Sequence, residues 1–162
     1  MTTGYFLPFL IILFSVTPVF GQNNQVTNIE DLYEQREIES IQNLLGRFEA
    51  SFNNRDIDAR MALCLDSYQE YAFEFGRVQH MRDYDTVKRE TAGYWRSIRS
   101  MSYSLDEIEI NLSGPMAQVR ASTTHLTETD RHRSVVNFSL LKINGRWWIA
   151  WDSYNIIRRY EE

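Results

Sequence analysis

The chain has 162 residues, of which 24% are charged, and a formal net charge of −5 at neutral pH. This length suits a single domain, and the acidic balance argues against nucleic acid or an anionic membrane surface as a partner, because both attract basic proteins. The one cysteine, Cys64, excludes an intramolecular disulfide, and its apolar neighbours predict a buried structural thiol.

Residues 1–21 carry no charged side chain and are largely apolar. Pro8 and Pro18 interrupt this segment, which is also short for a membrane span, so we expect a secretory signal peptide cleaved after Gly21. The signal predicts a secreted, periplasmic or cell-envelope protein with no stable membrane insertion after cleavage. A retained membrane anchor remains the alternative, since the basic residues that usually begin a signal peptide are missing.

Residues 22–33 are expected to form a flexible lead, although Thr27 and Glu30 fit a capping box that would begin a helix near Asn28. Apolar residues then recur at three- and four-residue steps, which predicts a long amphipathic helix that ends at residues 53–55. Its apolar face consists of Ile38, Ile41, Leu45, Phe48 and Phe52.

Two shorter helices are expected next. Asp56 or Asp58 can cap one that runs through Cys64, and Asp85 can cap another over residues 86–98. Between them, residues 68–75 alternate loosely, which suits a short strand or an edge segment.

The chain from residue 102 onward has the pattern of a sheet. Residues 102–112 alternate with one slip between Leu105 and Ile108, which a β-bulge explains. Three further segments joined by short turns predict an antiparallel meander. They cover residues 116–128, 132–143 and 146–157. Helices followed by such strands define an α+β fold, in which the helices cover one face of the sheet.

Two stretches, residues 48–66 and the closing motif Asn-Gly-Arg-Trp-Trp-Ile at 144–149, resemble the nuclear transport factor 2-like superfamily and, within it, the SnoaL-like and ketosteroid isomerase-like branch. The resemblance implies a cone-shaped, cystatin-like roll with three N-terminal helices packed on a curved, mainly antiparallel sheet around a pocket. On this basis, residues 34–157 form the SnoaL-like domain and residues 158–162 a C-terminal tail.

Such proteins include isomerases, dehydratases, epoxide hydrolases and non-catalytic binding proteins, so the fold alone does not choose a function. The catalytic residues of the isomerases are mostly not matched by this sequence. Phe48 stands where the isomerases have an oxyanion-stabilising tyrosine, and it cannot donate a hydrogen bond. The acidic second donor corresponds to Ser139, and the base falls near Glu74. Where related sequences often place a histidine on the last strand, this chain offers Trp151 and Ser153.

Three residues are candidates for catalysis. Strand alternation puts His125 on the same face as Val119 and Ala121, where a buried neutral histidine could act as acid or base or orient a ligand. The alternative is a rim histidine bonded to a hairpin neighbour. Asp66 could pair with His125 to activate water, or it could be a solvated turn residue. Glu74 is the third candidate.

The chain is rich in aromatic residues, which predicts a pocket for a small, largely apolar or aromatic molecule. The residues expected to bind this ligand are Phe48, Tyr68, Tyr71, Trp95, Tyr103, His125, Ser139 and Trp151. Trp151 is expected to lie on the same face as Trp147 if the last strand is regular, and Trp148 on the opposite face.

We expect no metal and no cofactor. His80, His125 and His132 are widely spaced, and the sequence has no nucleophile elbow, phosphate-binding loop or dinucleotide fingerprint. The sequence thus predicts an exported homodimer, joined through the outer face of the sheet, that holds a small ligand. The alternatives are a cofactor-independent lyase, isomerase or hydrolase that uses Asp66, Glu74 or His125, and a scaffold whose assembly depends on Trp148 or Phe138.

Overall fold

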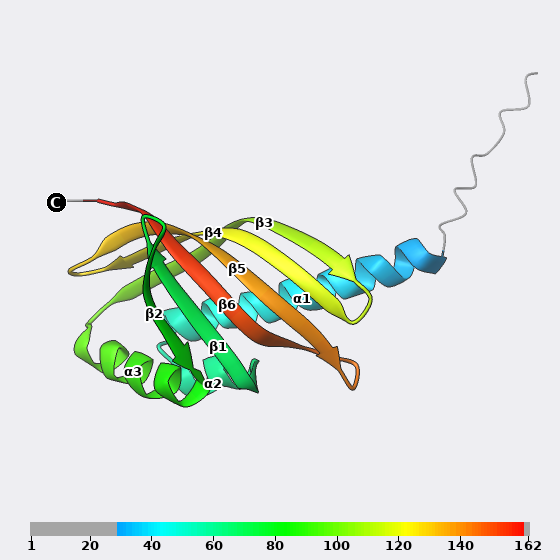
Figure 1. Cartoon of the computed structure of the whole chain (residues 1–162), viewed down its shortest axis with the longest axis horizontal. Helices are drawn as coiled ribbons and strands as arrows, with labels where there is room; N and C mark the ends of the chain where they lie inside the picture. The colour runs from blue at the N-terminus through cyan, green and yellow to red at the C-terminus, as the bar shows by residue number, and fades with distance from the viewer. Residues whose placement is uncertain (1–28, 161–162) are drawn as a thin grey trace, which may run out of the picture.

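The computed structural model describes residues 29–160 (Figure 1). The expected signal peptide and most of the expected lead lie outside the described residues. The first helix begins at Ile29, close to where the capping box predicts, so residues 29–33 are helical. The last strand extends to Arg159, into the segment expected to be a tail.

The first two helices follow the predicted order. α1 spans Ile29–Asn53 and buries the predicted apolar stripe, including Ile41 and Phe48. Asp56 caps α2, Ile57–Met61, by accepting a hydrogen bond from the backbone N–H of Ala59 at 2.9 Å. α2 was expected to continue through Cys64 but ends earlier, because Leu63 and Cys64 already join the sheet beside Ile149.

The third helix, α3, spans Tyr84–Ser97. Its cap is Asp83 rather than the expected Asp85, since the Asp83 carboxylate accepts a hydrogen bond from the backbone N–H of Thr86 at 2.9 Å. A strand that was not predicted, β2 (Arg77–Asp83), precedes it. Most of β2 is exposed at the edge of the sheet, so its sequence lacks the alternation that marks a half-buried strand.

The described strands form one sheet in the order β2-β1-β6-β5-β4-β3. Their remaining bounds are β1 Cys64–Glu74, β3 Met101–Ser113, β4 Met116–Thr127, β5 Arg131–Ile143 and β6 Arg146–Arg159. Within this sheet, β1 and β6 are parallel and the other neighbours are antiparallel. The predicted α+β class and the antiparallel meander are confirmed.

Two of the register shifts in the sheet bear on which side chains face inward. The register between β3 and β4 slips between Asp106 and Glu109, as predicted. A second slip was not predicted: Leu140 pairs with Ile149 but Ser139 pairs with Trp151, so one residue of β6 is left over. Trp147 and Ile149 face the core, and beyond the bulge the alternation is reversed.

The three helices of residues 29–160 lie against the concave side of the sheet, with α1 running along it and α3 near the edge formed by β1 and β2 (Figure 1). Phe48 of α1 packs edge-on against Phe138 of β5, with ring centroids 5.1 Å apart. Phe138 is fully buried in this core, so it cannot join an interface on the outer face as the scaffold alternative required.

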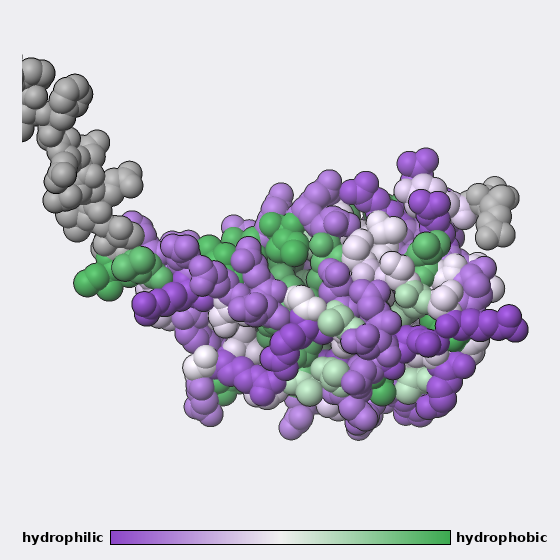
Figure 2. All heavy atoms as spheres, turned by 180° about the vertical axis from the view of Figure 1, so that it is seen from behind, coloured by the Kyte–Doolittle hydropathy of each residue, from purple (hydrophilic) through white to green (hydrophobic). Residues whose placement is uncertain are grey.

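None of the helices within residues 29–160 has the length and apolar character needed to cross a bilayer. Seen from behind, the surface is mostly hydrophilic (Figure 2). Exposed apolar side chains occur at the N-terminal end of α1, where Ile29 is 82% and Leu32 43% exposed.

Candidate functional site

A cavity of about 300 Å³ lies between the concave face of the sheet and the helices. One part of its wall is aromatic and comes from three elements. Phe48 and Phe52 extend from α1, Trp95 from α3 and Tyr103 from β3. Phe52 stacks on Tyr103 at 4.3 Å between centroids and meets Trp95 edge-on at 5.2 Å. This wall can hold a flat apolar group.

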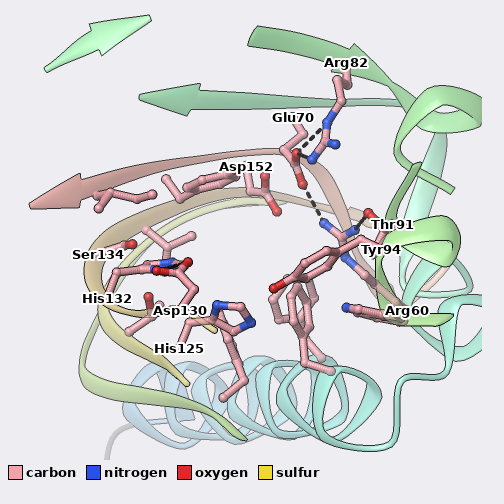
Figure 3. Close-up of a pocket in the computed structure, with 18 of the residues that line it drawn as sticks. Arg60, Glu70, Arg82, Thr91, Tyr94, His125, Asp130, His132, Ser134 and Asp152 are labelled. Atoms are coloured by element: carbon pink, nitrogen blue, oxygen red, sulfur yellow. Dashed lines mark hydrogen bonds and ion pairs between the residues drawn. The ribbon is translucent and has the colours of Figure 1, made fainter. Parts of the chain in front are cut away.

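A second part of the wall carries buried charge. Arg60 of α2 is only 2% exposed, and its guanidinium donates hydrogen bonds to Glu70 at 2.7 Å and to Tyr68 and Thr91 at 3.3 Å (Figure 3). It also lies 5.0 Å from the Phe52 ring centroid. Burial alone would lower the pKa of Arg60, but Tyr68, Glu70 and Asp152 raise it, so Arg60 stays charged.

Glu70 of β1 is the counter-ion of this arginine and of a second one. Its other carboxylate oxygen accepts hydrogen bonds from Arg82 of β2 (Figure 3). Burial alone would raise the pKa of Glu70, yet the charges of Arg60 and Arg82, with His80 3.6 Å away, hold it well below its usual value. Glu70 is therefore ionised and fully engaged.

Asp152 of β6 lies beside this cluster but is much less engaged. It is 3% exposed, and its Oδ2 accepts a hydrogen bond from the Tyr68 hydroxyl at 2.9 Å. Its Oδ1 has no hydrogen-bond partner in the described part of the chain. Burial and the charge of Glu70 raise the pKa of Asp152 to about 7, while Arg60 opposes the shift. Asp152 can thus take up or release a proton near neutral pH.

The opposite side of the cavity carries a third polar group, from the β4–β5 hairpin (Figure 3). His125 and His132 face each other across the hairpin, with ring centroids 4.9 Å apart. Nδ1 of His132 lies 2.8 Å from Oδ2 of Asp130, whose Oδ1 accepts a hydrogen bond from Arg159. His125 is 9% exposed, and burial lowers its pKa to about 4, so it is neutral near pH 7.

Four of the eight residues expected to bind a ligand lie in the cavity wall: Phe48, Trp95, Tyr103 and His125. Tyr68 is buried behind it, where it supports Asp152 and Arg60.

The structure does not bring the other expected residues to the cavity. Tyr71 and Trp151 pack against each other on the outer face of the sheet, with ring centroids 6.2 Å apart. Ser139, the cross-strand partner of Trp151, bonds there to the exposed Gln118. The expectation that Trp151 lies with Trp147 is wrong, because the bulge in β6 turns Trp151 outward.

The expected carboxylates also lie elsewhere. Asp66 is exposed and borders a separate shallow depression with Cys64 and Trp148, so it forms no couple with His125. Glu74 forms an ion pair with Arg159 at 2.6 Å and does not line the cavity.

Sequence reasoning missed Arg60, Glu70 and Asp152. Glu70 left a signal, since it alternates with the apolar inward residues Tyr68 and Ala72 on β1. Asp152 left none, because the bulge reverses the alternation just before it. The argument that widely spaced histidines cannot cluster fails for His125 and His132. The turn between residues 116–128 and 132–143 places these two side chains opposite each other.

No family model and no curated protein matches the chain. Solved structures do match. A candidate scytalone dehydratase from Novosphingobium aromaticivorans has a TM-score of 0.68 at 14% identity, covering 80% of this chain and 89% of that one. A candidate dehydratase of the NTF2-like family from Streptomyces avermitilis has a TM-score of 0.67 at 12% identity, covering 77% and 99%. An NTF2-like protein of unknown function from Pseudomonas putida has a TM-score of 0.64 at 14% identity, covering 75% of this chain and 87% of that one.

The chain thus has a cystatin-like fold, similar to that of these NTF2-like proteins. The predicted resemblance is confirmed at the level of the fold. At such low identities these proteins carry no activity over to this chain.

Proposed function

We propose that the cavity binds a small, largely apolar or aromatic molecule and that Asp152 moves a proton on it, as in a cofactor-independent lyase or isomerase. The observation that carries the proposal is the free Oδ1 of Asp152, a buried acid whose pKa of about 7 suits both donation and uptake of a proton. Two structural neighbours are described as dehydratases, which are lyases, and this agrees with the reaction class.

The aromatic part and the charged part of the cavity wall have different roles in this proposal. Phe52, Tyr103 and Trp95 hold the apolar part of the ligand, and the stacked geometry of Phe52 and Tyr103 favours a flat one. The Arg60 guanidinium lies in the same wall and supplies a fixed positive charge, which would stabilise negative charge that develops on the ligand when Asp152 removes a proton.

β-Tetralone, a flat aromatic ketone with exchangeable α-hydrogens, is a suitable probe. Its binding is measured by saturation-transfer NMR, and proton transfer by the loss of its α-hydrogen signals in D₂O. The protein should bind the ketone and accelerate exchange, whereas Asp152→Asn should bind it but lose at least about 100-fold of the acceleration, as for a general base. Asp66→Asn, an exposed aspartate outside the cavity, is the matched control and should exchange like the native protein.

Two results would contradict the proposal. Unchanged exchange in Asp152→Asn would remove Asp152 from the chemistry. Binding that survives Trp95→Ala and Tyr103→Ala unaltered would place the ligand outside the cavity. If the ketone binds without exchange even in the native protein, the binding role stands and the catalytic role falls.

We also propose that the protein is exported and forms a homodimer through the outer face of the sheet. What supports the second point is a set of aromatic side chains on that face, where Trp151 is 37% exposed and packs on Tyr71, with Phe73 and Ala150 beside them. N-terminal sequencing of protein recovered from its host would test cleavage after Gly21, and sedimentation equilibrium would test the dimer.

A further inference from the structure

We propose that His125, Asp130 and His132 form a binding site for one divalent transition-metal ion, with Zn²⁺ as the probe. Each residue offers one ligand atom, and these atoms all lie within 4.8 Å of one another. Two imidazoles and one carboxylate are a donor set that zinc and related ions take in proteins. The site goes beyond the proposed function, which rests on Asp152.

The hairpin fixes the three residues relative to one another. His125 and His132 are direct cross-strand partners in β4 and β5, so their side chains project from the same face. The turn is closed by Thr127, whose backbone N–H donates to the Asp130 carbonyl at 2.8 Å and whose hydroxyl accepts from the Asp130 N–H at 3.0 Å. The strand pairing and these hydrogen bonds therefore hold the backbone positions of the three residues relative to one another.

The state of the side chains points to a ligand. His125 is about nine-tenths buried, yet its Nδ1 has no hydrogen-bond partner among residues 29–160. A buried polar atom without a partner is costly, and a metal ion would satisfy it. Oδ2 of Asp130 and Nδ1 of His132 lie 2.8 Å apart, so an ion can bind both atoms in place of the hydrogen bond that now joins them, while Arg159 engages only Oδ1.

The position of the cluster gives the ion access to the cavity. All three residues belong to its wall, and Tyr94 and Tyr103 pack near His125 at 6.3 and 6.4 Å between ring centroids. Three protein ligands leave a coordination position open, as in catalytic rather than structural zinc sites. An ion held here would present that position to whatever occupies the cavity.

Zinc binding is tested on the full chain after treatment with a chelator. Calorimetric titration should show one Zn²⁺ per chain, and Co²⁺ should give the visible absorption bands of a low-coordinate site. The chain has three histidines, so His80→Gln, which removes the one outside the cluster, is the matched control and should keep the affinity. His125→Gln and His132→Gln should each weaken binding at least about 100-fold, and Asp130→Asn about 10-fold or more.

Circular dichroism and thermal unfolding confirm that each variant folds. Should His125→Gln fail to fold, His132→Gln and Asp130→Asn decide the question, because both change less buried side chains. No stoichiometric binding by the native chain, unchanged affinity in the folded cluster variants, or loss of binding in His80→Gln would overturn the site. Zinc is titrated without any organic ligand, so the result does not depend on the role proposed for Asp152.

Discussion

Glu70 and Asp152 are direct partners on the neighbouring strands β1 and β6, and both are almost fully buried. Their pKa values are nevertheless shifted in opposite directions. Glu70 faces two guanidinium groups, which hold its pKa low, whereas Asp152 receives one hydrogen bond from Tyr68 and has a pKa of about 7. Burial is common to both, so the charged partners decide which carboxylate ionises. Glu70 is thereby a fixed counter-ion, and Asp152 is available for chemistry.

Of the substitutions that test this difference, the one that removes the charge of Glu70 should have the largest effect on stability. Glu70→Gln leaves Arg60 buried without its counter-ion, which should lower the free energy of unfolding by about 3–5 kcal/mol. Urea unfolding measures the loss. In the folded fraction, the pKa of Asp152 should fall, because Glu70 raises it, and carbon-13 NMR of the carboxyl group would report this.

The matched control is Glu74→Gln on the same strand. Glu74 pairs with Arg159, which is 42% exposed, so solvent weakens this ion pair and its loss should cost at most about 1 kcal/mol. Equal losses in the two variants would mean that the Arg60–Glu70 pair is not desolvated as the structure shows.

Asp152→Asn should change how stability depends on pH. The pKa of Asp152 rises from 3.8 to about 7 on folding, so the folded chain binds more protons than the unfolded chain between these values. The stability that this group contributes is complete below about pH 4 and is lost as the pH rises through about 7. Asparagine does not titrate, so the variant should gain roughly 2–3 kcal/mol relative to the native chain between about pH 5 and about pH 8.

Urea unfolding of both proteins at several pH values measures this difference. Asp66→Asn, which changes an exposed aspartate, should show no such trend over the same range. A flat difference for Asp152→Asn would mean that Asp152 does not titrate in this window, and the proposed proton transfer would lose its basis.

The sequence predicted those parts of the structure that follow a regular period. The stripe of α1 through Ile41 and Phe48 and the alternation of β4 through Val119 to His125 are regular, and the structure buries these residues. Regular elements encode their faces locally, so sequence suffices to assign them.

The charged part of the site was not predictable in this way. Arg60 lies in a helix of five residues, too short to show a period, and it is buried only because Glu70 and Thr91 from other elements receive its hydrogen bonds. Asp152 faces the cavity only because β6 carries a bulge whose position depends on its pairing with β5. Both placements are set by tertiary contacts, which sequence periodicity does not report.

The smallest effect on folding should come from Trp151, the residue that the same bulge turns outward. Trp151→Gln should lower the free energy of unfolding by about 1 kcal/mol or less, because the side chain is 37% exposed and packs mainly on Tyr71. Phe138→Ala, in the fully buried core, is the contrasting variant and should cost about 3–5 kcal/mol. If the proposed homodimer forms, sedimentation equilibrium should show that Trp151→Gln weakens it. If Trp151→Gln destabilises the fold as much as Phe138→Ala, then Trp151 belongs to the core. The bulge would then not lie between Ile149 and Trp151, and Asp152 would not face the cavity. A stable variant that still dimerises would leave Asp152 facing the cavity and would remove Trp151 from the interface.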